Sequence, residues 1–168
     1  VLDRFYHTAE FYQADVVVRI TGDCPLISGT FVDQFVQVFG EVNVDYVSNI
    51  DPPSFPDGFD VEVFSFNCLK DAFEKANSPF EREHVTPYIR RRTEKKFNIY
   101  HEKNLSSIRL TLDTRYDLYI LNLVVDDLKA GLGFSVKEVI DHVLENPSLL
   151  GNNQNSTRNV GSKMNKGQ

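Results

Sequence analysis

Apolar side chains recur along the chain at two spacings, and each predicts one kind of element. Helical spacing predicts an opening helix, a second helix through residues 31–39 and a third over residues 69–76. Residues 14–20 are a short, almost continuous apolar run rich in β-branched side chains, typical of a strand buried on both faces. Further strands are expected at residues 45–48, 60–64, 97–100 and 108–112. Strands alternating with helices indicate an α/β sandwich with a mainly parallel central sheet.

Helix starts and chain breaks divide the pattern further. Residues 78–81, Ser-Pro-Phe-Glu, resemble a capping box with proline at the first helical position, and that helix cannot pass Pro87 without a kink or break. Two more capping boxes, at residues 114–117 and 135–138, open the last helices. Residues 51–58 carry three prolines and a glycine, so they are expected to be a binding loop. We expect one domain at residues 1–150 and a flexible polar tail at residues 151–168.

Composition removes several classes of function. The 168 residues contain no apolar run near the ~20 needed to span a bilayer, and no signal-peptide pattern, so no membrane contact is expected. Two cysteines outside any Cys-x-x-Cys pair argue against a zinc site and favour the cytoplasm. A net charge of −6 argues against nucleic-acid binding. The basic run at residues 90–92 is interpreted as a solvated helix end rather than a phosphate-binding patch.

Two aspartates stand where predicted strands end. Asp23 follows the strand at residues 14–20, and Asp113 follows the one at residues 108–112. Ligands of open α/β sheets bind at the carboxyl ends of strands, and Mg²⁺ needs few protein carboxylates when phosphate and water complete its shell. The sequence therefore suggests that the two carboxylates converge on Mg²⁺. A helix cap or a turn former predicts the same residue at either position.

Two other polar residues allow two interpretations each. Arg19 interrupts a strand of Val and Ile, so its side chain either faces an anionic ligand or forms a structural ion pair, for example with Asp15 or Glu83. His84 belongs to the polar group Glu-Arg-Glu-His at residues 81–84, which suits a substrate-contacting cluster or an ordinary surface helix end.

Five ordered motifs resemble one family, the cytidylyltransferases of the spore-coat-polysaccharide type, related to CMP-Kdo and CMP-sialic acid synthetases. The motifs are Val1-Leu2-Asp3-Arg4-Phe5, residues 18–26 (VRITGDCPL), residues 45–49 (DYVSN), residues 55–64 (FPDGFDVEVF) and residues 81–88 (EREHVTPY). The resemblance implies a Rossmann-like nucleotidyltransferase fold that transfers CMP from CTP to a sugar, with release of pyrophosphate. If the chain is truncated at Val1, the exposed sheet edge and apolar helix faces favour a homodimer as one arrangement.

The resemblance also assigns roles to residues. Gly22-Asp23-Cys24-Pro25 matches the family's Gly-Asp-x-Pro motif, and residues 113–118 (DTRYDL) match its Asp-Thr-Pro-Glu-Asp-Leu motif except at Arg115 and Tyr116. These matches make Asp23 and Asp113 the expected catalytic Mg²⁺ ligands. Nucleotide contacts are implied for Asp3, Arg4 and Arg19. Sugar contacts are implied for Asn49, Asp57, Asp60, Glu83 and His84.

One departure from the family bears on activity. Its enzymes open with a strand and a loop of the type Ala-Arg-x-Gly-Ser-x-Arg-Leu-Pro-x-Lys, and no such sequence occurs here. We therefore expect the C-terminal part of the fold, truncated at its N-terminus, and no CTP-dependent pyrophosphate release by this chain alone. A catalytically silent fragment, or a sugar-binding or interaction module, is the alternative. A glycosyltransferase would need an Asp-x-Asp motif, which the sequence lacks.

Overall fold

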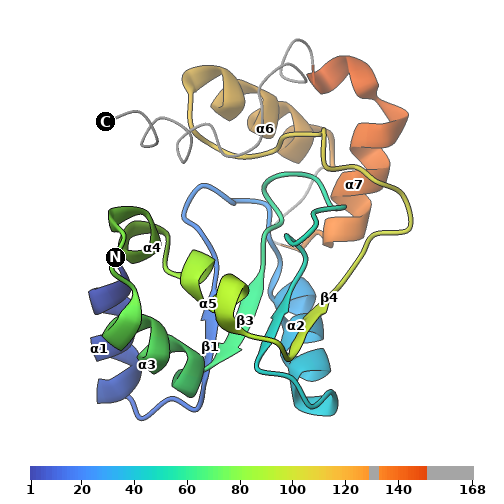
Figure 1. The fold of residues 1–168 in the computed structure, drawn as a ribbon. Helices are drawn as coiled ribbons and strands as arrows, with labels where there is room; N and C mark the ends of the chain where they lie inside the picture. Colours follow the sequence, from blue (N-terminus) through green and yellow to red (C-terminus); the bar gives the residue numbers. More distant parts are fainter. Residues whose placement is uncertain (129–132, 151–168) are drawn as a thin grey trace.

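The computed structural model describes residues 1–128 and 133–150, and Figure 1 shows their path. The order of elements is α1 (Leu2–Phe11), β1 (Val16–Arg19), α2 (Gly29–Glu41), β2 (Tyr46–Ser48), β3 (Glu62–Ser65), α3 (Phe66–Lys75), α4 (Pro79–His84), α5 (Thr86–Arg92), β4 (Lys96–Asn98), α6 (Arg115–Asp127) and α7 (Val136–Glu145).

The described strands form one mixed sheet in the order β1-β3-β2-β4. β3 runs antiparallel to both of its neighbours, and β4 runs parallel to β2. The expected α/β architecture is therefore found, but the mainly parallel pairing is not. The reason lies between β2 and β3, where an irregular loop lets the chain reverse, whereas a parallel return needs a longer crossover that is usually helical.

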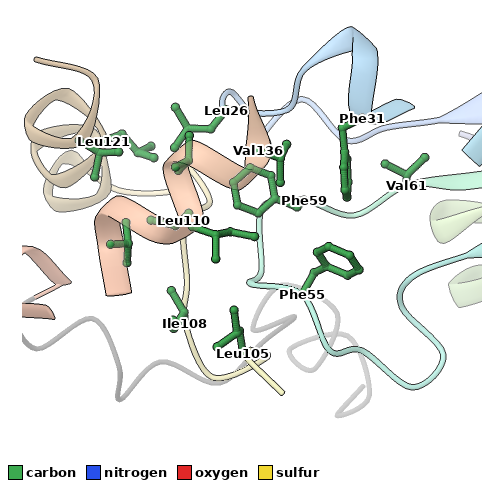
Figure 2. Packing of buried hydrophobic residues seen from close by; sticks show 14 of the residues in the cluster. Leu26, Phe31, Phe55, Phe59, Val61, Leu105, Ile108, Leu110, Leu121 and Val136 are labelled. Atoms are coloured by element: carbon green, nitrogen blue, oxygen red, sulfur yellow. The ribbon is translucent and has the colours of Figure 1, made fainter. Parts of the chain in front are cut away.

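Successive side chains of a strand point to opposite faces of the sheet. Each face therefore presents apolar side chains, and helices cover both faces. Tyr46 and Phe64 belong to the core cluster formed with α1, α3 and α5. Val47 and Val63 belong to the larger cluster formed with α2, α6 and α7. In that cluster the ring of Phe31 lies 5.3 Å from Phe55 and 6.3 Å from Phe59, centroid to centroid (Figure 2). These rings attach the loop after β2 to the helical layer.

Local signals in the sequence place most helix starts correctly. The boxes at Thr114 and Ser135 form with both reciprocal hydrogen bonds, and Ser78 caps α4 through the N–H of Glu81 at 3.1 Å. The helix breaks before Pro87, as predicted, which separates α4 from α5. The predicted polar tail at residues 151–168 lies outside the described residues.

Residues 108–112 are extended but do not form the predicted strand. A single bridge joins Arg109 to Asp57, with the Asp57 N–H donating to Ile108 at 2.8 Å and the Leu110 N–H donating to Asp57 at 2.7 Å. Gly58 permits this close approach, since it has φ of 113° and an added Cβ would lie 2.7 Å from the Leu110 carbonyl oxygen. Among the described helices, none is long and apolar enough to cross a membrane.

Candidate functional site

Polar side chains gather at one end of the sheet, where β1 and β2 finish and β3 begins. Glu62, the first residue of β3, is paired in register with Arg19 on one side and Ser48 on the other. Each of these residues stands at a strand end that otherwise consists of apolar side chains. The topology thus brings the carboxyl ends of β1 and β2 and the first residue of β3 to the same end of the sheet. Ligands of open α/β sheets bind at the carboxyl ends of strands.

Glu62 is the centre of a buried hydrogen-bonded cluster. Its carboxylate accepts hydrogen bonds from Arg19 at 2.6 Å, from the Thr86 hydroxyl at 3.1 Å and from the Tyr46 hydroxyl. The Glu62 side chain is 1% exposed and that of Arg19 is 18% exposed. Burial and the neighbouring Glu62 charge raise the pKa of Tyr46 well above its usual range. The structural ion pair considered for Arg19 therefore forms, although its partner is Glu62 and neither Asp15 nor Glu83.

His84 lies against this cluster with an unmet hydrogen-bonding capacity. Its Nε2 atom is buried and has no hydrogen-bond partner in the described part of the chain, and the same holds for Nε of Arg90. Burial, followed by the charges of Arg19 and Arg90, lowers the pKa of His84, so the imidazole is neutral at pH 7. Val85 follows with φ of 69° and ψ of −61°, a strained conformation for a β-branched residue.

The turn that contains Asp23 lies beside the segment that contains Asp113. The N–H of Leu112 donates to the carbonyl of Asp23 at 2.9 Å, so Asp113 is one residue away from a direct backbone contact with that turn. The Asp113 side chain is 54% exposed and accepts hydrogen bonds from Arg109 and, at 3.1 Å, from the Thr111 hydroxyl. The two segments that carry the predicted metal ligands are adjacent, although ninety positions separate the aspartates.

Asp117 fixes the backbone of this second segment. Its carboxylate accepts hydrogen bonds from Arg109 at 2.6 Å, from the N–H of Asp113 at 3.0 Å and from the N–H of Thr114 at 2.7 Å. Burial opposes its ionisation, but these hydrogen bonds outweigh burial and hold the pKa of Asp117 well below its usual range. Asp117 is thus a buried capping anion, which leaves Asp113 as the exposed carboxylate.

A third carboxylate, Asp60, lies beside the Asp23 turn. Burial, followed by the charges of Asp23 and Asp60, raises the pKa of the Cys24 thiol to about 11. Only a carboxylate close to Cys24 exerts such an effect. The described residues nevertheless contain no group of three His, Cys, Asp or Glu side chains that could by themselves hold a metal ion.

Three residues with implied ligand contacts have other partners or surroundings in the described structure. The Asp3 carboxylate pairs with Arg82 on α4, and Glu83 is exposed, with the amino group of Val1 at 4.0 Å. Arg4 lines a groove between α1 and β1. The structure therefore does not bring Asp3, Arg4 or Glu83 together with Asp23 and Asp113 in the described contacts.

Two predicted sugar contacts are buried in the fold instead. Asn49 is fully buried, and its amide donates to the Phe59 carbonyl at 2.7 Å and accepts from the Val61 N–H at 3.0 Å. Asp57 is 7% exposed, and its backbone is paired with the segment at residues 108–110. Asn49 holds the loop between β2 and β3 in place through its side chain and Asp57 does so through its backbone, and the sugar contacts implied for both residues stay predictions.

Known proteins resemble this chain over most of its length. The family model for cytidylyltransferases matches residues 1–146. The chain belongs to the cytidylyltransferase family. An uncharacterized protein of Methanocaldococcus jannaschii is 38% identical over 161 residues, which are 92% of this chain and 64% of that protein. The spore coat polysaccharide biosynthesis protein SpsF of Bacillus subtilis is 28% identical over 156 residues, which are 88% of this chain and 62% of SpsF.

A solved cytidylyltransferase from Leptospira borgpetersenii serovar Hardjo-bovis has a similar fold, with a TM-score of 0.82 and 33% identity. The match covers 93% of this cytidylyltransferase chain and 66% of the Leptospira chain. The chain thus spans just under two thirds of the length of the proteins that it matches.

Several residues of the site are absent from the sequence-based assignments. Glu62, Thr86 and Tyr46 form the cluster around Arg19, and Arg109 bridges Asp113 and Asp117. One signal for Glu62 was present in the sequence, since it interrupts an apolar strand as Arg19 does. Two opposite charges that each interrupt a buried strand are candidates for forming an ion pair with each other.

Proposed function

We propose that the whole protein to which this chain corresponds transfers CMP from CTP to a sugar. The observation that carries the proposal is the hydrogen bond from Leu112 to the carbonyl of Asp23, because it unites the two aspartate motifs at the ligand-binding edge of the sheet. The family supports the reaction type. The name of SpsF, which refers to spore coat polysaccharide biosynthesis, supports a sugar as acceptor.

The available side chains suit Mg²⁺ that is shared with phosphates. Asp23 and Asp113 supply hard carboxylate oxygens, Asp113 is exposed, and the described residues hold no third ligand that completes an all-protein cage. Mg²⁺ takes few protein carboxylates when phosphate oxygens and water fill its other positions. Asp23 and Asp113 would hold the ion, which when bound offsets the negative charge of the triphosphate.

The chain's own residues then provide positioning and polarity. Arg109 keeps Asp113 at the edge of the site, while Asp117 fixes the backbone N–H groups around it. His84, neutral and with an unmet Nε2, is suited to hydrogen-bond a sugar hydroxyl, and Asp60 lies on the Asp23 side of the same edge. Phosphoryl transfer depends mainly on such positioning and on charge stabilisation.

A pyrophosphate-release assay tests the proposal. The natural protein that contains this chain is incubated with CTP, Mg²⁺ and a panel of acidic and neutral sugars. Asp23→Asn and Asp113→Asn are each expected to lower kcat at least about 100-fold, since each removes a charge that acts on the phosphates in the transition state. Asp33→Asn is the matched control, because Asp33 is exposed on α2 and is not one of the proposed site residues.

Two outcomes contradict the proposal. One is wild-type turnover in both the Asp23→Asn and the Asp113→Asn variants. The other is saturable sugar binding by the natural protein without release of pyrophosphate from CTP, which would favour a sugar-binding module of the same fold.

A further inference from the structure

Three consecutive arginines end α5, and their surroundings differ. Successive residues of a helix are about 100° apart, so Arg90, Arg91 and Arg92 point in different directions. Arg91 and Arg92 are exposed, and Arg91 pairs with Glu81 at 2.7 Å. Arg90 is instead partly buried, and its Nε atom is fully buried. The interpretation of residues 90–92 as a solvated helix end therefore holds for Arg91 and Arg92 but not for Arg90.

Arg90 lies on the side of α5 that faces the cluster around Glu62. Residues four positions apart share one face of a helix, and Thr86, four positions before Arg90, donates to Glu62 at 3.1 Å. The charge of Arg90 also acts on two neighbours of Glu62. Burial is the largest cause of the lowered pKa of His84, and the charge of Arg90 adds to it. The same charge opposes the rise that burial causes in the pKa of Tyr46.

The cluster has no acceptor left for Arg90. The Glu62 carboxylate already accepts three hydrogen bonds, from Arg19, Thr86 and Tyr46. Nε of Arg90 has no hydrogen-bond partner among the described residues. Two guanidinium groups thus lie around a single buried carboxylate, which neutralises only one of them. A water molecule would accept from one N–H without offsetting the remaining charge, whereas an anion does both.

We infer that Arg90 binds an oxyanion of the ligand, next to the hydroxyl that His84 is proposed to bind. The inference rests on the proposed function only in placing a ligand at this edge of the sheet. Nε2 of His84 and Nε of Arg90 are both buried and unpartnered in the described part of the chain, so one ligand can meet both. The planar guanidinium offers parallel N–H groups to two oxygens of a carboxylate or a phosphate. A carboxylate of the sugar and a phosphate of CTP share this chemistry, and the experiment separates the two sources.

Binding is measured on the natural protein that contains this chain, without Mg²⁺, by titration calorimetry and by NMR of the arginine Nε–H groups. The probes are inorganic phosphate, glucuronate and glucose, which is the neutral counterpart of glucuronate. We expect saturable binding of at least one anion, a shift of the Arg90 Nε–H signal and no binding of glucose. The anion that binds more tightly identifies the source of the oxyanion.

Variants of neighbouring arginines separate a specific contact from general attraction to the basic run. Arg90→Met keeps an apolar stem but no charge or N–H group, and is expected to weaken anion binding about tenfold or more. Arg91→Met is the matched control, because the Arg91 side chain is 59% exposed, and its affinity should stay within about twofold of wild type. Arg90→Lys keeps the charge without the planar fork and should weaken binding less than Arg90→Met does. It also provides the test if Arg90→Met fails to fold.

Three results would overturn the inference. They are the absence of saturable anion binding by the wild type, unchanged affinity in the Arg90 variants, and an equal loss of affinity in Arg91→Met. None of these results depends on catalysis. Anion binding that requires Arg90, in a protein that releases no pyrophosphate from CTP, would contradict the proposed function and support the inferred contact.

Discussion

Replacing Glu62 with glutamine tests how much the buried cluster contributes to stability. Glutamine preserves the shape of the side chain but removes the anion that accepts hydrogen bonds from Arg19, Tyr46 and Thr86. Breaking a buried ion pair from one side costs about 3–5 kcal/mol. Because the Arg19 side chain keeps 18% of its exposure, some solvation remains, and we expect a loss of about 2–3 kcal/mol in the free energy of unfolding.

Urea denaturation followed by circular dichroism measures this loss. Glu81→Gln is the matched control, since Glu81 pairs at 2.7 Å with Arg91, whose side chain is 59% exposed, and its loss should stay below about 1 kcal/mol. The double variant Arg19→Met with Glu62→Gln should lose less than the sum of the two single variants, because it leaves no unpaired charge. A loss below about 1 kcal/mol in Glu62→Gln would refute the assignment of a buried ion pair.

Three further predictions concern other parts of the site. Gly58→Ala should lower the free energy of unfolding by about 1–3 kcal/mol in thermal denaturation, since the added Cβ meets the Leu110 carbonyl at positive φ. The pKa of Asp117 is lower in the folded chain than its ordinary 3.8, so the unfolded chain binds the proton more readily. The free energy of unfolding should therefore fall as pH drops below about 3.8. This fall with pH should be smaller in the Asp117→Asn variant. The Cys24 thiol, with its pKa raised to about 11, should react with a disulfide reagent at pH 8 more slowly than an exposed thiol; equal rates would contradict its burial.

The sequence predicted which segments are strands better than it predicted how they pair. Periodicity and β-branched content identify β1, β2, β3 and β4 within about two residues. Pairing direction depends on what connects the strands, and residues 49–61 contain no helical pattern, so an antiparallel return was open to the chain. Residues 108–112 have the composition of a strand, but among the described residues they form a single isolated bridge, with the loop at Asp57, and one further backbone hydrogen bond, from Leu112 to Asp23. Such tertiary pairing is not encoded in local propensity.

The predicted site shows a similar division. The aspartates were identifiable because each follows an apolar segment directly, and the hydrogen bond from Leu112 to Asp23 makes their two segments adjacent, while their shared role at Mg²⁺ stays a prediction. The partner of Arg19 was harder to identify, because it depends on which residue of the neighbouring strand lies opposite Arg19. The antiparallel register of β1 with β3 places Glu62 across from Arg19. The structural role of Asn49, whose side chain bonds the backbone of Phe59 and Val61, was not identifiable from the sequence either, because it depends on how the loop folds back.

Val85 forms a strained turn beside the cluster around Glu62. A buried, β-branched residue at φ of 69° stores about 1–3 kcal/mol of strain, which persists only where surrounding contacts enforce it. Its neighbours are Thr86, which donates to Glu62, and His84, whose Nε2 is buried without a partner in the described residues. A purely structural turn before Pro87 could relax and expose the imidazole to water. Burial and the charge of Arg19 lower the pKa of His84, and under the proposed function its unpaired Nε2 would meet a sugar hydroxyl there.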